Sequence, residues 1–195
     1  MNAQINALID RISALEGELD AELAKRSAEL RIGIEHGRVA FEEEILRRHR
    51  QLRTRLLPYV FGANPLIALT APVIYAGIVP FVLLDLFMTI YQAVCFPVYG
   101  IAKVKRSDYL VFHRSHLAYL NALEKFNCAY CSYGNGLIAY TREIAARTEQ
   151  YWCPIKHARR VVGAHARYAL FEHYGDGENY QQRLAELRKG LIKAE

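Results

Sequence analysis

Apolar residues form one unusually long run in this chain, from Leu57 to Ile101, and Asp85 is the single formally charged residue within it. A helix in the core of a soluble domain needs only an apolar stripe, whereas a membrane crossing needs roughly 20 successive apolar residues. Residues 57–102 are therefore predicted to lie in a lipid bilayer, and the remaining sequence is interpreted around this anchor.

The run is long enough for two crossings, and we predict a transmembrane helical hairpin. Its turn is expected at residues 77–80, between one helix over residues 59–76 and another over residues 81–101. Arginines precede the run and Lys103, Lys105 and Arg106 follow it, and Lys and Arg favour the cytoplasmic side. The predicted location is thus the inner, cytoplasmic membrane, with both termini in the cytoplasm. A re-entrant hairpin and a single long kinked helix remain alternatives, because the turn has no polar residue.

Asp85 is the exception within the apolar run. A carboxylate at the bilayer centre costs about 2.5–3.5 kcal/mol on insertion scales, which the neighbouring leucines and phenylalanines can offset. One interpretation makes Asp85 a proton or cation relay, or the partner of a basic group in another helix. The other places it near the membrane interface or at the cap of a broken helix.

The N-terminal arm, residues 1–56, repeats apolar residues every three or four positions, which predicts one long amphipathic helix. The spacing from Leu19 to Leu23 departs from strict heptads as a stutter in a coiled coil does, and Gly33 and Gly37 predict a bend. Such a stripe must pack against a second copy, the chain's own C-terminal domain or another helical protein. Its positions are Ile5, Leu8, Ile12, Leu15, Leu19, Leu23, Leu30, Ile34, Phe41, Ile45, Leu52 and Leu56.

The C-terminal part, residues 103–195, is predicted to be a small cytoplasmic helical domain. The expected turn Gly134-Asn135-Gly136 separates its first two helices, since that triplet favours positive φ. The four expected helices cover residues 115–133, 137–152, 154–173 and 179–193. With no strand pattern in view, the chain is predicted to be an all-α membrane protein.

Four residues of this domain have the spacing of metal ligands: Cys128, Cys131, Cys153 and His157. The pattern resembles the Cys₃His sites of zinc-binding modules, and the turn at residues 134–136 is expected to bring the two pairs together. Cysteines in a reducing cytoplasm are more often metal ligands than disulfides. Zinc is the predicted metal, with iron as the alternative, and the site would staple a domain too small to be stable alone. The alternative is that the cysteines pack in a helical core and the histidine lies on the surface.

The formal net charge of +5 raises the question of nucleic-acid binding. The positive excess lies at the two ends of the apolar run, while residues 1–44 are acidic. Membrane topology and anionic headgroups account for this distribution, so nucleic acid is not an expected partner. The basic residues Lys156, His157, Arg159 and Arg160 are expected to face headgroups or solvent.

No catalytic motif was found: the chain lacks a phosphate-binding glycine loop, a serine nucleophile elbow and a kinase signature. We therefore expect a membrane-anchored, zinc-stabilised protein that acts in interaction or assembly at the cytoplasmic membrane face. The alternative is a membrane-associated metal or thiol redox protein with its centre near a lipid or quinone cleft, as the Cys-x-x-Cys pair and the surrounding aromatic residues would allow.

Overall fold

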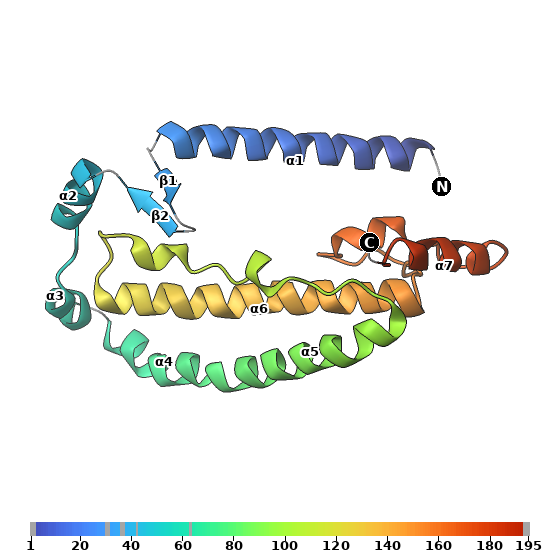
Figure 1. Cartoon of the computed structure of the whole chain (residues 1–195). Coiled ribbons are helices and arrows are strands. Elements are labelled where there is room, and N and C mark those ends of the chain that lie inside the picture. Colours follow the sequence, from blue (N-terminus) through green and yellow to red (C-terminus); the bar gives the residue numbers. More distant parts are fainter. Residues whose placement is uncertain (1–2, 30–31, 36–37, 42, 63, 193–195) are drawn as a thin grey trace. The chain divides into compact units, whose positions relative to one another are not determined.

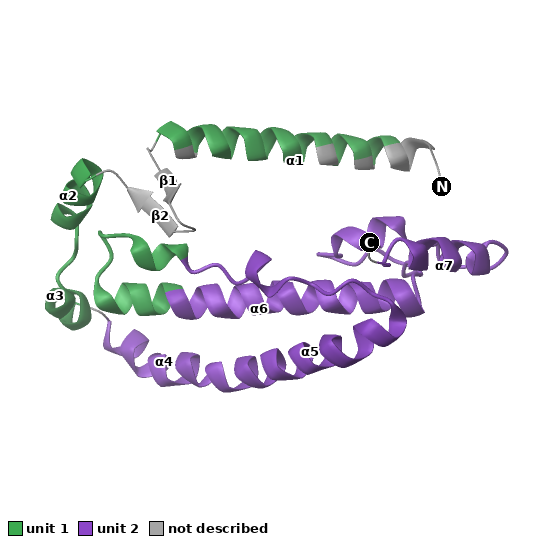
Figure 2. Cartoon of the chain, viewed as in Figure 1, with its two compact units in different colours: residues 1–62, 113–128 green, residues 63–112, 129–195 purple. Residues whose placement is uncertain are grey.

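The computed structural model describes residues 3–29, 32–35, 38–41, 43–62 and 64–192, and most of them are helical (Figure 1). The prediction of a helical fold is thereby confirmed. The chain divides into two compact units, residues 1–62 with 113–128 and residues 63–112 with 129–195 (Figure 2). The elements are α1 (Ala3–Glu29), β1 (Ile32–Glu35), β2 (Arg38–Phe41), α2 (Glu43–Gln51), α3 (Leu56–Phe61), α4 (Pro65–Ala76), α5 (Ile78–Tyr99), α6 (Ala122–Trp152) and α7 (Tyr180–Lys189), with short 3-10 helices η1 (Arg106–Asp108), η2 (His113–His116) and η3 (Ala166–Leu170).

The N-terminal arm is not one helix, which corrects the prediction for residues 1–56. After α1 the chain forms an antiparallel hairpin, in which Ile32 pairs with Phe41 and Glu35 with Arg38. The sequence IGIE and RVAF alternates β-branched or aromatic residues with others, a strand pattern that the three-four apolar repeat had obscured. Gly33 lies in β1 rather than at a helix bend. Gly37 lies outside the described residues.

In unit 2, α4 leads into α5 without a turn, so the predicted hairpin at residues 77–80 is wrong. Gly77 has right-handed helical angles, φ −57° and ψ −16°, and its carbonyl accepts a hydrogen bond from the Phe81 backbone N–H. Pro80 lies in the first turn of α5. Backbone N–H groups in a first turn have no acceptor within their helix, so a proline, which has no N–H, costs little there. The apolar segment Pro65–Tyr99, 35 residues, is long and apolar enough to cross a membrane.

The chain reverses direction at the end of α5. Gly100 has a left-handed φ of 70°, and the Ile101 N–H donates to the Phe96 carbonyl at 2.8 Å, as in a Schellman motif. Phe96 and Ile101 are both buried there. Residues 100–112, called the return segment below, then run back along α5 and α6, so that these two helices are parallel (Figure 1).

Helix α6 begins at a cap that the sequence analysis missed. The Asn121 carboxamide oxygen accepts from the Leu123 and Glu124 N–H groups, both at 3.0 Å, and the Glu124 carboxylate accepts from the Asn121 N–H at 2.8 Å. This reciprocal arrangement is a capping box. Ser115, the predicted start of this helix, lies in η2 instead.

Gly134 and Gly136 do not end a helix, and the turn predicted at residues 134–136 is wrong: α6 is continuous from Ala122 to Trp152. A Cβ on Gly134 would lie 2.8 Å from the Phe81 ring, and one on Gly136 would lie 2.5 Å from the Tyr109 carbonyl oxygen. Both glycines therefore allow a close approach, of α5 in one case and of the return segment in the other.

The core of unit 2 combines residues from α5, the return segment, α6 and the C-terminal end. Its buried members are Met88, Phe96, Ile101, Val104, Leu137, Tyr140, Ile144 and Leu191. Residues 153–165 are not helical, so the predicted third helix is wrong. The buried Pro154 instead begins a bridge, accepting from the Glu172 N–H at 2.8 Å through its carbonyl. The predicted last helix corresponds to α7.

Candidate functional site

Helix α5 has polar groups on its buried face and apolar groups on its exposed face. Asp85, Met88, Gln92 and Phe96 follow at intervals of three or four residues and are all buried, so they share one face. The opposite face is entirely apolar and is 54% to 76% exposed at Leu83, Leu86, Phe87, Ile90, Val94 and Val98. The buried face thus combines apolar core residues with two polar side chains, and the exposed face, which is polar in a helix packed on the core of a soluble domain, is apolar here.

Asp85 forms an ion pair with the return segment. Both Arg106 terminal nitrogens donate to its carboxylate at 2.7 Å, one to each oxygen, and the Tyr133 hydroxyl donates at 2.9 Å from α6. Such a bidentate pair is among the stronger polar contacts in proteins and neutralises the carboxylate. Arg106 had been counted as part of the positive flank of the membrane segment. Its role as the partner of Asp85 follows only from the path of the return segment.

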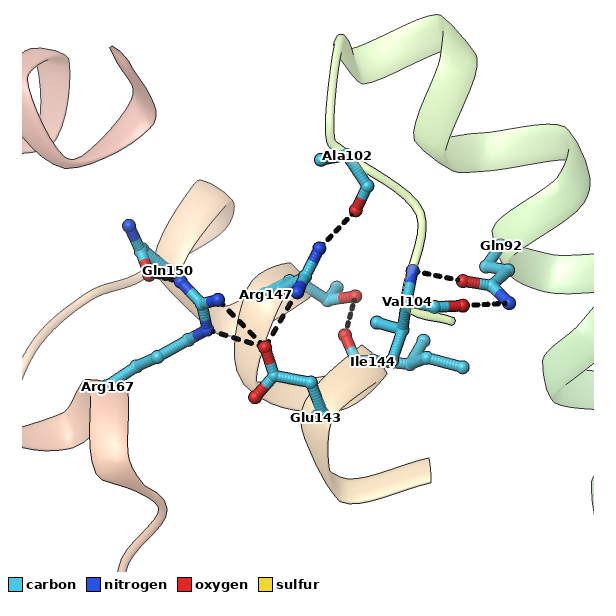
Figure 3. Close-up of polar contacts among 9 residues, drawn as sticks. Gln92, Ala102, Val104, Glu143, Ile144, Arg147, Gln150 and Arg167 are labelled. Carbon is cyan, nitrogen blue, oxygen red and sulfur yellow. Dashed lines mark hydrogen bonds and ion pairs between the residues drawn. The ribbon is translucent and has the colours of Figure 1, made fainter. Parts of the chain in front are cut away.

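A second buried polar group, Gln92, holds the return segment through its backbone. The Val104 N–H donates to the Gln92 side-chain oxygen at 3.0 Å, and the Gln92 amide nitrogen donates to the Val104 carbonyl at 3.4 Å (Figure 3). The same nitrogen contacts the Tyr140 hydroxyl of α6. A side-chain amide thus satisfies both backbone groups of one residue, which a neighbouring strand would otherwise do.

An ion-pair network fastens the C-terminal residues 153–192, called the C-terminal lobe below, to α6. The Glu143 carboxylate accepts from Arg147 at 2.8 Å and from two nitrogens of Arg167 at 2.8 and 3.0 Å (Figure 3). Arg167 also donates to Gln150, which in turn donates to the Leu187 carbonyl of α7 at 2.7 Å. This network occupies the structural role that the sequence analysis assigned to a metal.

The charges around Glu143 shift its acidity. Burial by itself raises the pKa of the Glu143 carboxyl, but hydrogen bonds and charge from Arg167 and Arg147 outweigh this, and the pKa lies below its ordinary value of 4.5. The carboxylate is therefore ionised throughout the neutral range, and both guanidiniums keep their partner there.

The four predicted metal ligands are not brought together. Cys131 and Cys153 are separated by about two thirds of α6, which at 1.5 Å per residue amounts to about 33 Å. Cys128 lies one turn before Cys131 on the same helix, and all the cysteines are free thiols. His157 stacks on Tyr168 instead, with 3.1 Å between its Nδ1 and the phenol oxygen. Within the described residues, no three His, Cys, Asp or Glu side chains form a group that could hold a metal.

The physical reason is the continuity of α6. The proposed centre required residues 134–136 to fold one ligand pair back onto the other, and that turn does not exist. His165, which also lies in the C-terminal lobe, is paired with Glu149 of α6, with 2.9 Å between nitrogen and oxygen. The zinc or iron centre therefore has no support from the geometry of this chain.

A groove of about 450 Å³ lies between the middle of α5 and the C-terminal part of α6. Its lining is mainly apolar and includes Phe87, Met88, Ala145, Trp152 and Cys153. Tyr91, Thr148 and Glu149 also line it, and the Tyr91 and Thr148 hydroxyls are 3.0 Å apart, so polar groups interrupt a mainly apolar wall.

Comparisons of the chain with known protein families, with curated proteins and with solved structures found no match.

Proposed function

We propose that this protein is a membrane-associated assembly protein, whose α4 and α5 lie in lipid and whose α1 binds a second copy. The observation that carries the proposal is the exposed apolar face of α5. Burying a large apolar side chain is worth roughly 1.5–3 kcal/mol, so a continuous exposed apolar face is costly in water. Lipid removes that cost, and the polar face of α5 is already satisfied by α6 and the return segment.

The neighbours of α5 favour an orientation along the membrane surface over a crossing. Lys103 and Lys105 of the return segment and Arg142 of α6 are exposed. Because both elements run alongside α5, a crossing would carry these charges into the hydrocarbon, at about 2.5–3.5 kcal/mol for each at the centre. At about 52 Å, Pro65–Tyr99 is also longer than the roughly 30 Å hydrocarbon core. An in-plane helix with its apolar face in lipid meets both constraints.

The partner of α1 is proposed from its heptad pattern. Ile5, Ile12 and Leu19 occupy a positions and Leu8 and Leu15 occupy d positions. Isoleucine at a with leucine at d favours parallel two-stranded coiled coils. The described members Leu8, Ile12, Leu15 and Leu19 are 54% to 60% exposed. A seam of about two heptads is weak alone, but confinement to a membrane raises the effective concentration of the second copy.

The orientation is tested by nitroxide depth measurements along the exposed face of α5. Val79, Ile90 and Val94 are similarly exposed, at 59%, 54% and 61%, and each is replaced by a labelled cysteine in a cysteine-free background in phosphatidylcholine vesicles. An in-plane helix gives equal depths at all three positions. A crossing helix spreads them by up to about 22 Å, the rise over 15 residues. A label at Ile138 of α6 is the control and is expected to remain accessible to water-soluble relaxants.

Equal depths support the in-plane proposal, and a graded series contradicts it in favour of a crossing. Labels at all three positions that are as accessible to water as the one at Ile138 contradict membrane association itself.

The second candidate, a membrane-associated redox protein, is favoured by one observation, the apolar groove beside Cys153 and Trp152. Trp152 is the only tryptophan of the chain, so its fluorescence reports on this groove. A short-chain quinone that enters the groove is expected to quench Trp152 saturably, and Ala145→Phe, which fills the groove, to abolish saturation. Quenching that stays linear with quinone concentration in both proteins contradicts this candidate.

A further inference from the structure

A basic pocket of about 350 Å³ lies in the C-terminal lobe, away from the lipid-facing side chains of α5. Besides Ala158 and Tyr174, its lining comprises three cations, two imidazoles and a phenol, all of which can donate hydrogen bonds, and none of its lining residues is acidic. They are Lys156, His157, Arg159, Arg160, Tyr168 and His173. A cavity with this composition is suited to an anion with several acceptor oxygens.

The backbone holds the two sides of the pocket together. Ile155 and Glu172 form a parallel bridge, in which the Lys156 N–H donates to the Glu172 carbonyl at 2.8 Å. This bridge places the chain leading into His157 beside the chain leading into His173, although the two lie far apart in sequence.

Tyr168 holds His157 in place within the pocket. Its hydroxyl accepts from the His157 backbone N–H at 2.6 Å, and its ring stacks on the imidazole with 5.9 Å between centroids. The His157 and Tyr168 side chains are therefore held before any ligand arrives, which lowers the entropic cost of binding at this side of the pocket.

The positive charge around Lys156 is only partly compensated by a nearby carboxylate. Burial lowers the pKa of Lys156, the charge of Arg183 acts in the same direction, and Glu172 opposes them only in part. A bound anion would restore the environment that favours the charged ammonium group.

We propose that this pocket binds a phosphomonoester group. Its cations and neutral donors match the charge and the three terminal oxygens of such a group, and its volume is at the lower end for small-molecule sites, enough for the phosphate and the group that it esterifies. The phosphate belongs either to a lipid headgroup or to a soluble phosphate ester. The lipid source rests on the proposed membrane association.

The test compares binding to phosphatidylcholine vesicles that contain phosphatidate, a phosphomonoester, or phosphatidylserine, a phosphodiester, at matched surface potential. Wild-type protein is expected to prefer phosphatidate by about tenfold, the effect of one additional charge-assisted hydrogen bond. Arg159→Gln with Arg160→Gln is expected to abolish that preference. Tyr168→Phe, which keeps the ring but loses the contacts to His157, is expected to reduce it.

The matched control is Arg47→Gln with Arg48→Gln, which removes the same charge from two exposed positions of α2. Diffuse attraction to an anionic surface weakens on both lipids alike in this control, and the preference for phosphatidate remains. If both double variants lose the preference for phosphatidate equally, and inorganic phosphate does not bind, the proposed phosphate site is wrong.

Inorganic phosphate, titrated against the full chain in phosphatidylcholine nanodiscs and followed by phosphorus NMR, separates the two sources. Phosphate binding that is lost in the Arg159/Arg160 variant, without lipid preference, assigns the pocket to a soluble ester. Lipid preference without free phosphate binding assigns it to a headgroup, and absence of both overturns the proposal. Binding to pure phosphatidylcholine vesicles reports separately on the proposed membrane association.

Discussion

Helices α1 and α5 both expose large apolar side chains, yet the two surfaces differ in width. On α1 the exposed residues form a narrow stripe at heptad spacing, flanked by charged residues such as Arg11 and Glu16. On α5 the exposed side opposite Asp85 is apolar over its whole width, and the single acidic side chain, Asp85, is turned inward onto Arg106. A stripe one seam wide fits another helix, whereas a face without any polar edge fits lipid. The width of an exposed apolar surface, rather than its existence, indicates the partner.

The largest effect is expected from a charged substitution on the exposed apolar face of α5, which should weaken binding to vesicles. Ile90→Lys places an ammonium group at a 54% exposed position of the apolar face, and the matched control Ile138→Lys makes the same change at a 52% exposed position of α6. Lysine is costly in hydrocarbon but can extend its amine toward the headgroups, so we expect about 2 kcal/mol, or about 30-fold weaker vesicle partition, for Ile90→Lys alone.

Vesicle flotation measures both variants. Equal losses in the two would indicate that α6 also enters the hydrocarbon, which contradicts the in-plane orientation, and no loss in either would contradict lipid contact by α5.

A smaller effect, on the unfolding free energy, is expected from a change in the ion-pair network around Glu143. Glu143→Gln leaves Arg147 and Arg167 without their shared carboxylate, and we expect about 1.5 kcal/mol lower unfolding free energy, the range for a hydrogen bond to a charged group. Chemical denaturation in detergent micelles measures this. Glu149→Gln, which changes the same kind of side chain outside this network, is the control and should have the smaller effect.

The lowered pKa of Glu143 also predicts that the unfolding free energy depends on pH. Because the folded pKa of Glu143 lies below its ordinary value of 4.5, the stabilisation is complete above about pH 4.5 and is lost as the pH falls through the folded value. The unfolding free energy of the wild type should therefore fall more steeply below pH 4.5 than that of Glu143→Gln. Parallel curves would show that the network does not contribute.

The smallest effect is expected from charge changes in α1, which test whether two copies of this helix pair in parallel. In that register Arg11, at a g position, faces Glu16 of the second copy, at the following e position. Arg11→Glu should weaken self-association by a few-fold, since an exposed pair contributes roughly 0.2–1 kcal/mol and occurs twice in the dimer. Adding Glu16→Arg should restore it.

Sedimentation equilibrium in micelles measures the association of both variants. An antiparallel pair would not be rescued by the second change, and a monomeric wild type would remove the proposed role of α1.

Several features of this chain follow from local sequence alone. The apolar composition of residues 65–99 is sufficient to predict a helical segment that is compatible with a membrane, but not that it forms one helix rather than a hairpin. The helical class, the extent of α7 and the helical part of α1 likewise follow from apolar periodicity, a property of short windows of sequence. The β1–β2 hairpin was accessible too, because its alternation differs from the helical repeat, but the longer pattern masked it.

The roles of the glycines and of the charged residues depended on the tertiary structure. Gly134 and Gly136 have the composition of a turn, and only the contacts with Phe81 and Tyr109 show that a side chain there would collide with a neighbouring element. The predicted metal site depended on that turn. Ligands that are spaced along the sequence meet only if the chain folds back between them, and α6 does not fold back. Arg106 likewise looks like a membrane flank until the return segment carries it to Asp85. Local periodicity specifies which segments are helical, but long-range contacts specify which residues meet, and only the folded chain contains them.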